Sequence, residues 1–192
     1  MVHRRVPREF VVDIEGGQAV QVALSVLQVA AWFGVEAGLV SADAALRQGR
    51  ATRADLDGAL PVLGGGRGQL RAARTAELAS GLSESAGESR TRWLLLTLGL
   101  PLPEQQVRIV DRDGVFVARV DFLYGDRRVV VEFDGMLKYD DPAALRQEKL
   151  REDRLRELGY EVVRLTWADL ADPSGVQRKL MAAFARSLAR RG

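Results

Sequence analysis

VFVARVDFLYGDRRVVVEFDGMLKY, from Val115 to Tyr139, decides the fold, because two runs of β-branched and aromatic residues flank Gly125-Asp126. Each run alternates with a period of two, which is typical of the paired strands of a β-hairpin. In the first run, the face that contains Phe122 is apolar, while Asp121 belongs to the opposite face. The stretch therefore predicts two neighbouring antiparallel strands with acidic side chains in otherwise apolar segments.

The second run repeats this arrangement, with Glu132 and Asp134 on the face opposite to its apolar residues. A two-residue turn at Gly125-Asp126 would place Asp121 opposite Val130 and diagonal to Glu132. Diagonal neighbours on one face have Cα atoms roughly 7–8 Å apart, which lets two carboxylates bind one hard cation. Like charges held this close are costly unless a positive charge lies between them. The hairpin alone is thus compatible with a metal site.

An ion pair is the alternative interpretation of the same hairpin. The two-residue turn places Arg119 directly opposite Glu132, where its guanidinium could neutralise the carboxylate in a plain cross-strand pair. The geometry of the hairpin leaves both interpretations open.

Composition excludes several kinds of chemistry. The 192-residue chain has no cysteine and a single histidine, His3, so disulfides, zinc ribbons, thiol nucleophiles and serine–histidine–aspartate triads are all excluded. Any catalysis must use carboxylates, Lys, Arg, Ser, Thr or Tyr. The chain has 25 Arg and three Lys with a net charge of +2, and an Arg bias of this kind is weak evidence for phosphate binding.

No segment of the sequence predicts a signal peptide or a membrane span. The N-terminus begins with basic residues, and the most apolar stretch, 17–35, carries a polar stripe at helical spacing. That stretch predicts an amphipathic helix from about Gln18 to Phe33. We therefore expect a cytoplasmic protein that does not bind membranes; the sequence does not determine its oligomeric state.

Residues 1–80 predict a smaller, mainly helical N-terminal region. Within residues 39–60 we expect two short helices, with Ser41 as the cap of the first and Thr52 as the cap of the second. A helix-turn-helix is an alternative for this pair, but the second helix has little basic charge, which favours simple packing. A helix after the glycine-rich break at 64–68 presents Arg67 and Arg71 on one stripe, as a phosphate contact or a solvated face.

Residues 81–192 predict a mixed α/β domain. A capping box, Ser85 with Glu88, begins a helix that ends near Leu98, and a strand leads from there into the hairpin. Asp141-Pro142 then begins a long helix whose Arg151 projects to the apolar side, while Lys149 and Glu152 point away from it. A further strand and a final helix complete a mixed β-sheet flanked by helices.

This order of elements resembles the very-short-patch-repair-like branch of restriction-endonuclease-fold nucleases. It is most similar to the domains of that kind in actinobacterial abortive-infection antitoxin-like proteins. The resemblance covers about residues 83–180, and residues 1–75 resemble the connecting region of the same proteins, with the winged helix absent. The motifs that carry it are ESRTR (88–92), RVDF (119–122), VVVEFDG (129–135) and REDRLRELGYEVVRL (151–165).

The resemblance implies a Mg²⁺- or Mn²⁺-dependent DNA endonuclease with a restriction-endonuclease-like fold. In this superfamily an Asp and an (Asp/Glu)-x-Lys motif bind the metal and activate water, which implies that Asp121 and Glu132 are the metal ligands. Asp134 occupies the usual lysine position, a departure from the pattern. Lys138, where the close branch commonly has histidine, is the candidate to orient the water, and Glu88 would support the metal.

The resemblance also implies that Arg151 contacts a phosphate, and the other candidate nucleic-acid contacts are Arg67, Arg71, Arg92 and Arg119. Two functions remain in competition on this evidence. One is the endonuclease, in DNA repair or phage defence; the other is a DNA-binding regulator or antitoxin-like protein on an inactive nuclease fold. A purely structural domain is the least favoured, because three acids and a lysine gather around one hairpin.

Overall fold

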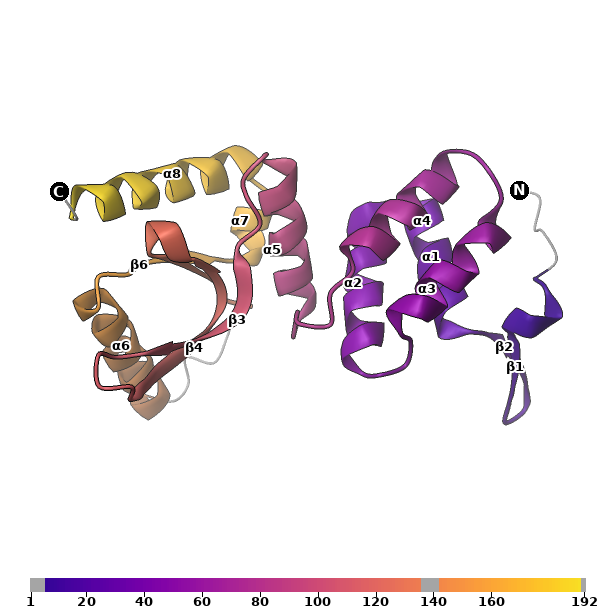
Figure 1. The fold of residues 1–192 in the computed structure, drawn as a ribbon, viewed down its shortest axis with the longest axis horizontal. Helices are drawn as coiled ribbons and strands as arrows, with labels where there is room; N and C mark the ends of the chain where they lie inside the picture. The colour runs from indigo at the N-terminus through magenta and orange to yellow at the C-terminus, as the bar shows by residue number, and fades with distance from the viewer. Residues whose placement is uncertain (1–5, 136–141, 191–192) are drawn as a thin grey trace. The chain divides into compact units, whose positions relative to one another are not determined.

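The computed structural model describes residues 6–135 and 142–190 and divides the chain into two compact units, Met1–Ser89 and Arg90–Gly192. The division falls inside one helix, α5 (Ala86–Thr97), nine residues after the boundary at 80/81 that the sequence suggests. Each unit is described on its own below, and Figure 1 shows the elements of both.

The N-terminal unit is mainly helical, as predicted, with one small hairpin at its start. Its elements are a 3-10 turn (Arg8–Phe10), β1 (Val11–Ile14), β2 (Gly17–Val20), α1 (Val22–Phe33), α2 (Val35–Arg47), α3 (Arg53–Ala59), a second 3-10 turn (Leu60–Leu63) and α4 (Arg67–Leu78). Its core is made of small and branched apolar residues from the four helices, with Leu24, Leu27 and Leu56 fully buried.

The prediction that a helix begins at Gln18 is wrong by four residues. Gly17–Val20 instead forms β2, which pairs antiparallel with β1 through Val11↔Val20 and Ile14↔Gly17. The reversal occurs at Gly16, whose φ of 84° is accessible to glycine without strain. Because the turn and β2 take up the residues up to Val20, α1 begins only at Val22.

The cap predictions for the next two helices have opposite outcomes. Ser41 does not cap a helix, because α2 already begins at Val35 and the Ser41 hydroxyl donates to the Ala37 carbonyl 3.1 Å away within it. Thr52 does cap α3, in a complete capping box with Asp55. A single 13-residue helix therefore replaces the first of the expected short pair.

The C-terminal unit is a mixed α/β domain, as predicted. After α5 it contains β3 (Glu104–Val110), β4 (Phe116–Tyr124), a 3-10 turn (Gly125–Arg127), β5 (Val129–Phe133), α6 (Pro142–Glu157), β6 (Glu161–Leu165), α7 (Trp167–Leu170) and α8 (Pro173–Ala189). The sheet order is β3-β4-β5-β6, in which the first three strands are antiparallel and β6 is parallel to β5. The crossover from β5 to β6 is the long helix α6.

Helices cover both faces of this sheet, and the alternation of the strands determines which residues face each helix. Phe122, Val131 and Val163 belong to a core shared with α5, α7 and α8. Leu123 and Val130 pack on the other face against Leu155 of α6. Figure 1 shows α6 and α8 on opposite sides of the strands. The face that carries Asp121 and Glu132 is therefore the α6 face.

Among the residues that the structure describes, no helix has both the length and the apolar character needed to cross a lipid bilayer.

Phe122→Ala should lower the free energy of unfolding by about 3–5 kcal/mol, because the ring is fully buried and its removal leaves a cavity. Phe116→Ala in the same strand is the matched control. Its ring is 50% exposed and lies under the Arg108 guanidinium, so we expect a loss of about 1 kcal/mol or less. Urea denaturation followed by circular dichroism measures both; equal losses would contradict the assignment of the core.

Candidate functional site

The pairing of β4 with β5 brings the two predicted metal ligands onto one face. Phe122 pairs with Val131 and Leu123 with Val130, and the same register continued by one pair sets Asp121 opposite Glu132. Opposed residues have Cβ atoms roughly 4.5–5.5 Å apart, closer than the diagonal arrangement that the sequence predicts.

The predicted register is wrong by two residues because the turn is longer than Gly125-Asp126. A 3-10 turn at Gly125–Arg127 is followed by Arg128 in the left-handed conformation, with φ of 47°. A shift of two residues keeps every side chain on its predicted face, since the strand period is two. It does move Arg119 from the position directly opposite Glu132 that the predicted register gave it.

The Asp121 carboxylate is oriented by the backbone of the neighbouring strand. Its Oδ2 accepts a hydrogen bond from the amide of Phe133 at 2.8 Å, and the side chain lies in a half-buried position. The amide that holds the Asp121 carboxylate belongs to Phe133, the residue that follows Glu132 in β5. One backbone contact therefore positions the first carboxylate relative to the strand that carries the second.

Glu132 is held by a guanidinium from α6. Arg151 Nη1 and Nη2 donate to Glu132 Oε1 and Oε2, both at 2.8 Å, in the planar two-pronged geometry that makes such pairs strong. The Glu132 side chain is 12% exposed and that of Arg151 is 25% exposed, so solvent screens the pair only in part. The prediction that Arg151 projects toward the sheet is confirmed, and the group that it meets is an acid.

The pair belongs to a chain of alternating charges between α6 and β6. Arg151 Nε donates to Glu148 Oε2 at 2.9 Å, and Arg164 contacts both Glu148 and Glu152, at 2.5 and 2.6 Å. Glu148, Arg151, Glu152 and Leu155 recur at the i, i+3, i+4, i+7 spacing of one helical face. Glu152 therefore faces the sheet, and the prediction that it points away is wrong.

These contacts shift two pKa values in opposite directions. Hydrogen bonds to Glu132 and Glu148 raise the pKa of Arg151 above its usual range, although burial opposes the shift. The hydrogen bond from Arg151 lowers the pKa of Glu148, helped by the charge of Arg164 and opposed by burial and by the negative charge of Asp134. Arg151 and Glu148 are therefore both charged at neutral pH, and Asp134 lies within electrostatic reach of Glu148.

The segment after Glu132 is described only in part. The Asp134 amide donates to the Leu165 carbonyl at 2.8 Å, which extends the β5–β6 pairing by one residue. Lys138, the predicted water-orienting residue, lies outside the described residues.

Trp167 borders this end of the sheet. Its Nε1 donates to the Gly135 carbonyl at 3.2 Å, its ring contacts Phe133 edge to face, and the Arg90 guanidinium lies 5.5 Å from its centroid. The ring is still 41% exposed. Sequence reasoning missed this residue, as it missed Glu148 and Arg164; the signal for Arg164 was a charge in the middle of the apolar run EVVRL.

Glu88 has a structural position in the first turn of α5. The Glu88 amide donates to the Ser85 hydroxyl at 3.1 Å, which confirms Ser85 as the cap, and the Glu88 carboxylate accepts from the Ser85 hydroxyl and from the amide of Glu84, one residue before the cap, both at 2.8 Å. The residue belongs to the N-terminal unit, whereas Asp121 and Glu132 belong to the C-terminal unit. Helix capping therefore accounts for Glu88 as the structure places it, and its support of a metal ion stays a prediction.

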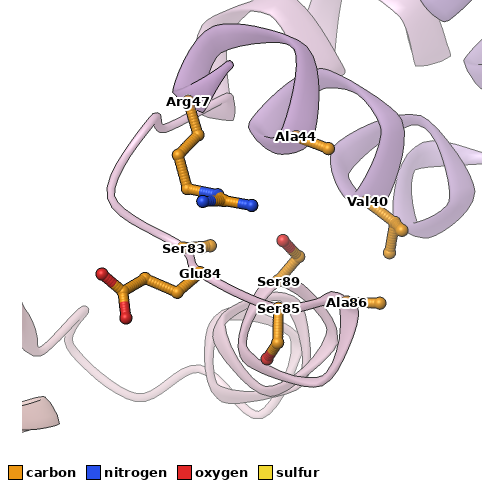
Figure 2. A pocket seen from close by; sticks show the side chains of 8 residues that line it. All are labelled: Val40, Ala44, Arg47, Ser83, Glu84, Ser85, Ala86 and Ser89. Carbon is orange, nitrogen blue, oxygen red and sulfur yellow. The ribbon is translucent and has the colours of Figure 1, made fainter.

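A cavity of about 170 Å³ lies beside this cap, between α2 and the first turn of α5. Figure 2 shows Arg47 and Ser89 directed toward its centre from the two helices. The Ser89 hydroxyl donates to the fully buried Asp43 at 2.7 Å, and Asp43 also accepts from the Ser80 amide. These contacts join α2 to the start of α5 within the N-terminal unit.

The other predicted nucleic-acid contacts differ in accessibility. Arg92 is 7% exposed, so the structure does not present it at the surface as a phosphate contact requires. Arg119 is exposed on β4. Arg67 and Arg71 are exposed on α4, and Arg71 also reaches the Ala31 carbonyl at 3.5 Å.

Comparison with known proteins finds relatives that match almost the whole chain. Uncharacterized protein MT2308 and Uncharacterized protein Rv2248, from the CDC 1551 / Oshkosh and ATCC 25618 / H37Rv strains of Mycobacterium tuberculosis, are each 34% identical to it over 190 residues. The match covers 99% of this chain and 68% of each relative. The chain belongs to their family. No family model matches it, and no solved structure matches it.

The match with these relatives extends over both units of this chain. Within residues 6–135 and 142–190, no three acidic or histidine side chains are grouped as metal ligands. The two opposed carboxylates, Asp121 and Glu132, offer oxygen donors of the kind that Mg²⁺ and Mn²⁺ prefer. Their donor type suits such an ion and the strand alternation sets them on one face, and Glu132 becomes available to an ion once Arg151 gives it up.

Arg151→Gln should raise the pKa of Glu148 toward its ordinary value of 4.5, because the hydrogen bond from Arg151 is the largest cause of its depression. A depressed carboxyl pKa stabilises the fold above 4.5, and this contribution is lost as the pH falls through the folded-state pKa. Titration of the Glu148 side-chain carboxyl carbon by NMR measures the shift. An unchanged titration in the variant would contradict the contact.

Proposed function

We propose that the protein is a metal-dependent endonuclease that hydrolyses DNA phosphodiester bonds, with a restriction-endonuclease-like fold in its C-terminal unit. The observation that carries the proposal is that Asp121 and Glu132 share one sheet face on adjacent strands, with the Asp121 carboxylate bound to the amide of Phe133 next to Glu132. The order helix, three antiparallel strands, helix and parallel strand is consistent with the resemblance of the motifs. Repair or phage defence is the proposed setting, in the cytoplasm.

Asp121 and Glu132 would hold the Mg²⁺ or Mn²⁺ ion. When bound, such an ion stabilises negative charge on the phosphate and lowers the pKa of a coordinated water. The contribution of the chain is geometric: the Phe133 amide orients Asp121 before any ligand arrives, which avoids reorganisation during the reaction. In this proposal Lys138 orients the attacking water, and Asp134 adds negative charge near the ion.

Arg151 has a second use in this proposal, as the group that contacts the phosphate. Its guanidinium has the planar donor arrangement that suits phosphate oxygens as well as carboxylates. It lies against Glu132, so a phosphate bound by Arg151 would be next to the carboxylate pair. Specificity for a mismatch, a flap or a sequence would arise from other surfaces.

Asp121→Asn and Glu132→Gln should each reduce cleavage of supercoiled plasmid in Mg²⁺ or Mn²⁺ at least about 100-fold. Losing a ligand removes several kcal/mol of transition-state stabilisation, and each 1.36 kcal/mol corresponds to a factor of ten in rate. Asp113→Asn, an exposed acid in the β3–β4 turn, is the matched control and should cut at the parental rate. Cleavage that survives both substitutions would show that the nuclease lies elsewhere, such as a contaminant.

The alternative function is a DNA-binding regulator or antitoxin-like protein on a catalytically inactive nuclease fold. The observation that favours it is the two-pronged pairing of Arg151 with Glu132, since a permanent ion pair removes the second metal ligand. Under this alternative the acids support the sheet and α6, and the basic surface still binds DNA. Binding without any cutting, unaffected by Asp121→Asn, would support the regulator.

Replacing Arg67 and Arg71 together by Ala should weaken DNA binding in EDTA under either function. Each arginine that contacts a phosphate contributes about one unit to the slope of log K against log salt, so the slope should fall by about two. Fluorescence anisotropy with a labelled duplex at several salt concentrations measures it. Arg112→Ala, at an exposed turn position in the other unit, serves as the control, and an equal effect there would argue against an α4 contact.

A further inference from the structure

We propose that Arg151 couples metal binding to nucleic-acid binding, because its guanidinium is shared between Glu132 and the phosphate of an incoming nucleic acid. When neither ligand is bound, Arg151 holds Glu132. A phosphodiester that takes the guanidinium releases the carboxylate to the divalent ion. This inference concerns the regulation of the proposed nuclease site and rests on that function.

The first support is competition at the Glu132 carboxylate. Both of its oxygens accept from Arg151 at 2.8 Å, and a two-pronged guanidinium uses the lone pairs that a metal ion bound by both oxygens would need. The charge of Arg151 also repels a cation placed beside it. A metal ion can therefore use Glu132 fully only after the guanidinium has moved.

The second support is that each partner keeps an opposite charge when the pair opens. Arg151 Nε remains bonded to Glu148 Oε2 at 2.9 Å on its own helix. Arg164 Nε lies 3.9 Å from Glu132 Oε2 on the next strand. Opening the pair thus leaves neither group as an isolated buried charge, which is the costly outcome when an ion pair is broken.

The third support is that the Asp121 carboxylate is held by a different kind of contact from that of Glu132. Asp121 is oriented by a backbone amide, a contact that does not depend on any mobile side chain. The Asp121 carboxylate is therefore oriented by the sheet backbone, whereas both oxygens of Glu132 are held by Arg151. The Arg151 side chain is 25% exposed, so a phosphate can reach it from solvent.

Thermodynamic linkage turns this exchange into a measurable property. If the nucleic acid raises the affinity for metal by a given factor, the metal raises the affinity for nucleic acid by the same factor. The factor depends on Arg151, because Arg151 is the group whose partner changes. A variant without the guanidinium should bind metal as tightly without nucleic acid as with it.

The test is a Mn²⁺ titration of the full chain, followed by electron paramagnetic resonance of the free ion. Each protein is titrated alone and with a short phosphorothioate duplex that resists cleavage, and the Mn²⁺ bound by the duplex alone is subtracted. The variants are Arg151→Gln, Arg151→Lys and Glu132→Gln. Arg154→Gln is the matched control, because Arg154 lies on the same helix and pairs with Asp111 instead.

We expect the duplex to lower the Mn²⁺ dissociation constant of the parental protein at least about fivefold, the low end of common coupling factors. Arg151→Gln should bind Mn²⁺ tighter by a similar factor without duplex and gain nothing from it. Arg151→Lys keeps the charge and lacks the planar two-pronged geometry, so its coupling should be intermediate. Arg154→Gln should match the parent.

The outcomes separate this inference from the function beneath it. If Mn²⁺ binds and Glu132→Gln weakens it, while both Arg151 variants behave as the parent, the coupling is overturned and the metal site stands. If no variant binds Mn²⁺ with or without duplex, the proposed nuclease site and the coupling both fail. If Arg151→Gln is misfolded by circular dichroism, Arg151→Lys decides by the same comparison.

Discussion

The pairing of Glu132 with Arg151 is the interaction on which this face of the sheet depends. A half-buried carboxylate near the end of a strand packed between helices would be costly without a compensating charge. The guanidinium that supplies it comes from α6, the helix that connects β5 to β6, so the same contact also fixes the rotation of that helix on the sheet. Leu155, one turn further along α6, then packs on Val130. Polar and apolar contacts therefore specify the same position of α6.

Much of the fold could be predicted because it follows from local periodicity. The alternation of the two strands predicted which residues share each face of the sheet, and the caps at Thr52 and Ser85 were evident from their spacing. The errors occur where longer-range geometry overrides a local pattern. Gly125-Asp126 was predicted to be the complete turn. The turn in fact continues to Arg128, whose left-handed conformation is not predicted by the local sequence. The first helix was predicted too long because β2 exists only through its pairing with β1.

The candidate site shows the same limit of prediction from local patterns more clearly. Alternation alone placed Asp121 and Glu132 on one face, and helical spacing placed Arg151 toward the sheet. The residues of the site could therefore be predicted. The partner of Arg151 could not, because it depends on the parallel register that sets Arg164 beside Glu132 and on the tilt of α6 over both. Glu148 and Glu152 looked like ordinary solvated residues of a charged helix. Only the tertiary arrangement shows that they neutralise Arg164 and Arg151.

A site made of carboxylates alone would attract a metal ion before any substrate arrived, whereas this one already contains a cation. That difference gives the chain an order of events that an open acidic cluster lacks. Arg151 prefers whichever anion is closest and best desolvated, and a phosphodiester is the one anion that a nucleic acid brings with it. Glu148 keeps the guanidinium anchored during the exchange, so the residue does not have to leave the site to change partners. An ion pair that appears to block catalysis is then compatible with a nuclease that assembles its metal site only on its substrate.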